Sequence, residues 1–158
     1  MCSSDLAGRL RDHDSHFTFG LSVGTPGCPV PTDGIAWKPT VQPIALDQWP
    51  VSEPPAQAPW TTVMNWASYR PKIWEGKPYG QKDLEFEKFS HLPKLTSQKL
   101  KIAMGLGVDG KRPAERLRYQ GWDLVEPQEV VPDHHAYRDF LTTSAGEWSV
   151  AKHGYVAA

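Results

Sequence analysis

Three residues in this chain have the type and the position for binding an anion. Lys152 and His153 follow a predicted strand over about 147–151, and Lys82 lies in the first turn of a predicted charged helix over about 81–92. A lysine ammonium binds phosphate as a point charge, and a histidine can act as an acid, a base or a phosphate contact. A cation in a first helical turn opposes the helix dipole, and an anionic ligand would explain that conflict. The alternative is that these are solvated surface side chains.

Four further candidates follow two short apolar runs. The side-chain amide of Asn65 could bond a ribose or a base, and the indole of Trp66 could stack on one. Gly105 and Gly107 could let a ligand approach the backbone, although no third glycine follows at the spacing of a dinucleotide-binding fingerprint. The alternatives are a cap at Asn65, a core ring at Trp66 and a plain turn at the glycines.

The two apolar runs, 61–64 and 100–104, flank the charged helix over about 81–92. Strand, helix and strand in this order form a βαβ unit, which favours parallel pairing and a right-handed crossover. Ligands of open α/β sheets bind where loops leave the carboxyl ends of the strands. Because Asn65 and Gly105 end these runs, the site is expected at that edge.

The remainder of the chain continues the alternation of strands and helices. The pattern predicts a helix over about 113–120, a strand over 122–125, a helix over about 133–143 capped by Asp133, and a last strand over about 147–151. The predicted fold class is α/β: a Rossmann-like parallel sheet of about four strands in the order 3-2-1-4, with flanking helices.

The charged helix has a predicted buried stripe. Phe86, Phe89 and Leu92 share one arc at helical spacing, and Glu85 and Lys88 lie on the opposite, solvated side. The helix is therefore expected to pack Phe86, Phe89 and Leu92 against the sheet.

Two other segments are predicted to lack regular helix. Nine of the 15 prolines lie between residues 26 and 59, which predicts an extended segment ending in a stiff linker over 52–59. The insertion 67–80 predicts a small hairpin around Glu75-Gly76.

The composition excludes several classes of partner. The 17 basic and 18 acidic residues form no basic stripe, which argues against a nucleic-acid partner. No apolar run approaches the roughly 20 residues of a membrane span. The two cysteines make neither a disulfide framework nor a metal-site spacing, which favours a cytoplasmic location. His134 and His135 are adjacent on a helix and are not expected to converge on one ion, so no metal or other cofactor is predicted.

Five stretches together resemble a family of bacterial glycosyltransferase-like proteins of the GT-B type, over about residues 16–156. They are VPTDGIAWKPTVQPIALDQWP, WTTVMNWASY, YGQKDLEFEKF, GWDLVEP and AYRDFLTTSAGEWSVAKHGYV. The resemblance implies two facing Rossmann-like domains, of which the C-terminal one holds a nucleotide-sugar donor. It implies that residues 7–41 end the N-terminal domain, that 42–59 are a Pro-rich linker and that 60–158 are an incomplete donor-binding domain.

The chain is expected to be a fragment. Residues 1–6, MCSSDL, resemble a translated sequencing adapter, a non-native scar. The segment that usually helps to hold the donor's phosphates and ribose in such proteins does not follow, so the fragment alone is expected to be inactive. The full protein would transfer a sugar from a nucleotide sugar to an unknown acceptor. The alternatives are a non-catalytic nucleotide- or sugar-binding module and a truncated, non-functional reading frame.

Overall fold

The computed structural model describes residue 8 and residues 10–156, apart from the side chain of Trp74. The predicted scar over residues 1–6 lies outside the described residues. Contacts divide the chain into two compact units, with the boundary between Leu46 and Asp47. That boundary falls inside the segment 42–59 for which an interdomain linker is predicted.

The first unit contains one small parallel sheet. Strand β1 (His16–Thr18) pairs with β2 (Trp37–Pro39), and the Thr40 amide donates to the Thr18 carbonyl at 2.9 Å. Pro39 removes one amide donor at the end of β2, which agrees with the short length of this strand.

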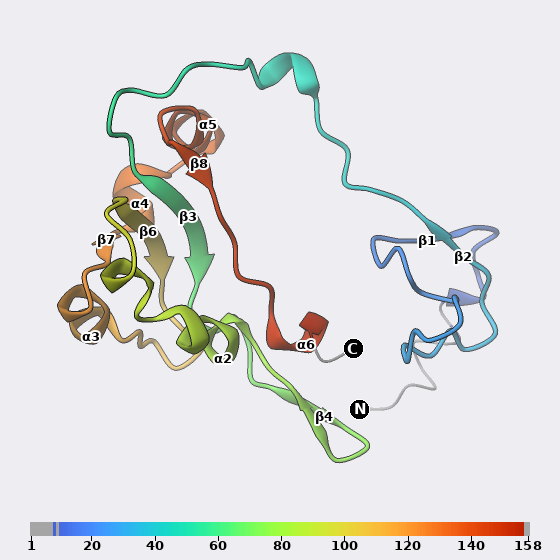
Figure 1. Cartoon of the computed structure of the whole chain (residues 1–158). Coiled ribbons are helices and arrows are strands. Elements are labelled where there is room, and N and C mark those ends of the chain that lie inside the picture. The colour runs from blue at the N-terminus through green and yellow to red at the C-terminus, as the bar shows by residue number, and fades with distance from the viewer. Residues whose placement is uncertain (1–7, 9, 157–158) are drawn as a thin grey trace. The chain divides into compact units, whose positions relative to one another are not determined.

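The second unit is built on a four-stranded, all-parallel sheet. Its strands are β3 (Trp60–Asn65), β6 (Leu100–Gly105), β7 (Asp123–Val125) and β8 (Gly146–Glu147), in the order β7-β6-β3-β8. The predicted α/β Rossmann-like class and the order 3-2-1-4 are therefore confirmed. Figure 1 shows β3 and β6 side by side, with their carboxyl ends directed toward α2 and the β4 hairpin.

The helices that flank this sheet are short. They are α2 (Lys82–Phe86), α3 (Ala114–Tyr119), α4 (Pro127–Val130), α5 (His134–Thr142) and α6 (His153–Val156), with 3-10 turns η1 (Leu46–Gln48), η2 (Glu87–Phe89) and η3 (Leu92–Lys94). Asp133 caps α5 as predicted, because its carboxylate accepts hydrogen bonds from the His135 and Ala136 amides, both at 2.9 Å. None of the helices among the described residues is long and apolar enough to cross a membrane.

The predicted hairpin is confirmed. Strands β4 (Lys72–Trp74) and β5 (Lys77–Tyr79) pair antiparallel, and the two residues between them have positive φ, 48° at Glu75 and 77° at Gly76. Two consecutive positive φ angles are typical of the tight turns that match the twist of a two-stranded ribbon.

The prediction of a single helix over about 81–92 is wrong. The α-helix ends at Phe86, and the chain continues as the 3-10 turns η2 and η3. The predicted stripe is broken as a result: Phe86 is fully buried, whereas Phe89 is 46% exposed. Pro93 lies inside η3, well after the end of α2, so the proline is not what ends this helix. Glu85, expected on the solvated side, is buried.

The fourth strand is shorter than the predicted range 147–151. It pairs with β3 through Gly146 and Glu147 only, and the next bond to β3 joins the Trp148 amide to the Thr61 carbonyl at 3.0 Å. A Cβ atom on Gly146 would lie 2.7 Å from the ring of Trp60, so a glycine fits this edge position where larger residues would not.

The core lies between the sheet and an aromatic cluster. Ile102 and Met104 of β6 are fully buried, as expected for a central strand of a parallel sheet. The ring of Phe86 lies 5.1 Å from that of Trp122, which in turn lies 5.3 Å from that of Trp148. The Trp122 indole donates to the Ser90 carbonyl at 2.6 Å, which satisfies its one polar atom inside the core.

Candidate functional site

Asn65 and Gly105 meet at the carboxyl end of the sheet. They are register partners at the last position of β3 and β6, and the Trp66 amide donates to the Gly105 carbonyl at 3.2 Å. The Asn65 side-chain oxygen lies where a Cβ atom on residue 105 would be. The absence of a side chain at Gly105 therefore leaves room for the Asn65 amide at the edge where ligands of such sheets bind.

Gly107 lies in a compact turn after β6. Its amide donates to the Lys111 carbonyl at 2.7 Å, and the next amide, of Val108, donates to the Ala67 carbonyl at 2.7 Å. A Cβ atom on Gly107 would lie 3.0 Å from the Lys111 carbonyl and 3.0 Å from the Asp109 carboxylate. These contacts explain the glycine by local packing, in agreement with the plain-turn alternative.

Trp66 belongs to the core. Its ring makes an edge-to-face contact with Phe86, with 5.7 Å between centroids, and packs against the buried cluster. Its carbonyl accepts a hydrogen bond from the Asp83 amide at 3.1 Å. Trp66 thus links the end of β3 to the first turn of α2, which agrees with the core-ring alternative and brings α2 to the site edge.

Two lysines predicted from separate segments lie near each other beside α2. The Lys82 ammonium donates to the Ser149 hydroxyl at 3.2 Å, and the Lys152 ammonium lies 4.7 Å from the ring centroid of Tyr69. Burial lowers the pKa of Lys82; the Glu147 carboxylate opposes this change and the Lys152 ammonium adds to it. Neither lysine forms an ion pair within the part of the chain that the structure describes.

Tyr69 lies beside Lys152, and no sequence pattern identifies Tyr69 as a site residue. Hydrogen bonding with Gln81 lowers the pKa of the Tyr69 phenol, and the positive charge of Lys152 acts in the same direction. Gln81 itself is buried, and its side-chain oxygen has no hydrogen-bond partner among the described residues. Only its position in the sequence could have pointed to Tyr69, because this residue lies in the insertion that leaves the carboxyl end of β3.

His153 is held by a buried glutamate. Its Nδ1 lies 2.8 Å from one Glu85 oxygen, and Lys88 donates to the other at 2.7 Å. The Lys88 and His153 partners lower the pKa of Glu85. The His153 amide also donates to the Gln81 carbonyl at 3.2 Å, so this residue fastens α6 to the start of α2. The structure thus brings Lys82 and Lys152 together and engages His153 in a structural pair.

The helix dipole contributes little at Lys82. Helix α2 has only five residues, its N-cap Gln81 makes no side-chain capping bond, and Asp83 and Glu85 lie in its first turn. An anion near Lys82 would therefore be held by the ammonium groups of Lys82 and Lys152, because a helix this short has a weak dipole and two carboxylates in its first turn.

Groups suited to a metal ion are absent from residues 8 and 10–156. No cluster of three or more His, Cys, Asp or Glu side chains with suitable geometry occurs in these residues. His134 and His135 are exposed, with ring centroids 3.9 Å apart, and no third ligand accompanies them in the described part of the chain.

The fold defines a protein of the Rossmann-like α/β class. Comparisons with protein-family models, with curated proteins and with solved structures give no significant match.

Proposed function

We propose that residues 60–158 belong to the donor-binding domain of a GT-B-like glycosyltransferase. The full protein would move a sugar from a nucleotide-sugar donor to an acceptor that is not identified. The resemblance of the five sequence stretches supplies the reaction class. The observation that carries the proposal within this chain is the Lys82–Lys152 pair near the carboxyl end of a parallel sheet. Neither ammonium group forms an ion pair in the described residues, although the Glu147 carboxylate is close enough to oppose the lowering of the pKa of Lys82 by burial.

The paired lysines suit the leaving group of such a reaction. A nucleoside diphosphate gains negative charge as its bond to the sugar breaks, and cations already in position stabilise that charge without a metal ion. Lys82 and Lys152 would contact the diphosphate, and the Asn65 amide would face the ribose or the base. Trp66, Gly105 and Gly107 would shape the edge of the site through their packing.

The second candidate is a binding module that does not catalyse transfer. It is favoured by the contact between His153 and Glu85, which occupies the one histidine among the candidate site residues. On this view the same lysines hold a nucleotide or a sugar phosphate, and no bond is broken. The cytoplasmic location expected from the two cysteines remains a prediction under either view.

A binding experiment tests the proposal on the chain as it exists. Uridine, guanosine and adenosine diphosphates are titrated into the protein by isothermal titration calorimetry, with Lys82→Gln, Lys152→Gln and the surface control Lys94→Gln. We expect one diphosphate to bind, each site variant to weaken it about tenfold because a charge-assisted contact is lost, and the control to match the wild type. Binding that Lys82→Gln and Lys152→Gln leave unchanged would refute the proposed site, and turnover with a nucleotide sugar would separate the transferase from the binding module.

A further inference from the structure

A polar pocket of about 480 Å³ lies at the opposite, amino end of the sheet. Four separate segments contribute to it: the loop before β3, the turn after η3, the start of β6 and the start of β7. Its volume falls in the range of small-molecule sites. The lining residues are Gln57, Pro59, Pro93, Gln98, Lys99, Leu100, Lys101, Gly121 and Asp123.

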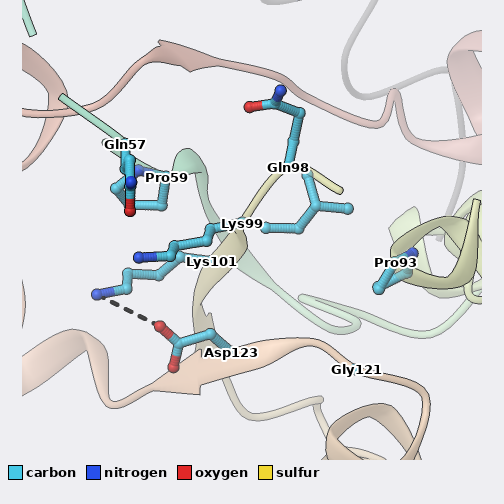
Figure 2. A pocket seen from close by; sticks show the side chains of 9 residues that line it. Gln57, Pro59, Pro93, Gln98, Lys99, Lys101, Gly121 and Asp123 are labelled. Carbon is cyan, nitrogen blue, oxygen red and sulfur yellow. Dashed lines mark ion pairs between the residues drawn. The ribbon is translucent and has the colours of Figure 1, made fainter. Parts of the chain in front are cut away.

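The pocket has an excess of positive charge. Lys99 directly precedes β6, and Lys101 is the second residue of that strand. Figure 2 shows the two side chains extending next to each other below Gln57 and Pro59. Two ammonium groups and one carboxylate line the pocket, which leaves one net positive charge.

The single carboxylate is already paired. Asp123 lies 3.3 Å from the Lys101 ammonium, as the dashed line in Figure 2 marks. Lys99 takes part in no ion pair within residues 8 and 10–156. An anion in the pocket would therefore meet one ammonium without a competing carboxylate and a second one shared with Asp123.

The backbone around the pocket is unusual in two places. Gln57 has φ of 63°, a left-handed conformation that is uncommon for a residue with a side chain and that clusters at ligand sites. Gly121 has φ of 104°, and a Cβ atom there would lie 3.0 Å from Pro93 Cβ. Together these residues keep one wall of the pocket free of side-chain bulk and place a carboxamide on another wall.

We infer that this pocket binds a small organic anion, a phosphomonoester or a carboxylate, through Lys99 and Lys101. The carboxamide of Gln57, which lies beside the two lysines in Figure 2, supplies a hydrogen-bond donor for a remaining polar group of the ligand. The pocket is distinct from the Lys82–Lys152 cluster, because its residues lie at the amino ends of β6 and β7 and the cluster lies near the carboxyl end of β3. Either site can therefore be correct without the other.

Nuclear magnetic resonance titration of the whole chain tests this site. The probes are glycerol 3-phosphate, succinate and inorganic phosphate, and the readout is the amide shifts of Lys99, Lys101 and Gly121. We expect saturation at one of the two organic anions with Kd of about 1 mM, weaker binding of inorganic phosphate, and a loss of affinity with added salt. The anion that saturates the shifts at the lower concentration shows whether the pocket prefers a phosphate or a carboxylate group.

Two lysine variants test whether Lys99 is responsible for anion binding in this pocket. Lys99→Gln removes the ammonium that has no ion pair and leaves the Lys101–Asp123 pair intact, so we expect Kd to rise at least about fivefold without a change of fold. Lys94→Gln, a surface lysine outside the pocket, is the matched control and should bind as the wild type does. The inference is overturned by an absence of saturable shifts with both organic anions, by unchanged affinity in Lys99→Gln, or by equal loss in Lys94→Gln.

Discussion

The side-chain oxygen of Asn65 fills the space in which a Cβ atom on Gly105 would lie, and the two residues are register partners at the last position of β3 and β6. The glycine at 105 therefore leaves room for the present orientation of the exposed Asn65 side chain. The two positions should be coupled in stability as well as in ligand binding.

The first prediction follows from this contact. Gly105→Ala should lower the free energy of unfolding by about 1 kcal/mol or less, because the new methyl group displaces the side chain of Asn65, which is exposed and can adopt another rotamer. Asn65→Ala combined with Gly105→Ala should recover most of that loss. Urea denaturation of the wild type, both single variants and the double variant measures the coupling, and purely additive effects would show that the residues do not compete for this space.

The second prediction concerns the aromatic cluster. Phe86→Ala should lower the free energy of unfolding by about 3–5 kcal/mol, because Phe86 is fully buried between Trp66 and Trp122. Phe89→Ala is the matched control, and the exposure of Phe89 limits its effect to about 1 kcal/mol or less. Chemical denaturation gives both values, and equal losses would restore the continuous buried stripe that the sequence predicts.

The arrangement of the sheet could be predicted because its signals are local and repeated. The runs at 61–64 and 100–104 are largely apolar and are separated by a segment that contains a helical pattern, which leaves few topologies open. Asp133 and the Glu75-Gly76 turn were predictable for the same reason, since a cap and a tight turn depend on a few neighbouring residues.

The burial of Glu85 and the end of α2 could not be read from the sequence in the same way. Helical periodicity places Glu85 on the solvated side, and its burial is possible only because Lys88 and the distant His153 supply charge partners. Likewise, Tyr69 joins Lys152 across 83 positions of the chain, and no local pattern predicts that contact. Long-range pairs of this kind decide which of the candidate residues share a site.

The third prediction concerns the cap of α5. Asp133→Ala should lower the melting temperature, because the His135 and Ala136 amides lose the acceptor that now lies 2.9 Å from each. Asp133→Asn keeps a side-chain oxygen at that position and should retain most of the stability of the wild type. Thermal unfolding followed by circular dichroism compares the three proteins, and similar losses in both variants would assign the effect to the negative charge of Asp133, with the hydrogen-bonded oxygen contributing little.

The fourth prediction is a pH dependence that originates at Glu85. Hydrogen bonds and charge from Lys88, followed by those from His153, lower the pKa of the folded Glu85 below its ordinary value of 4.5. In acid, the unfolded chain therefore takes up a proton at Glu85 at a higher pH than the folded chain does. The stabilisation is fully present above pH 4.5 and is lost as the pH falls through the lowered pKa of the folded state.

Glu85→Gln isolates this contribution. The variant should be less stable than the wild type at neutral pH, because Lys88 and His153 lose their carboxylate partner, and the difference should shrink as the pH falls below 4.5. Glu115→Gln, at an exposed position on α3, is the control and should follow the wild type over the whole range. Urea denaturation at several pH values measures the difference, and a gap between the wild type and Glu85→Gln that stays constant into acid would mean that the Glu85 carboxylate is not what fastens α6 to α2.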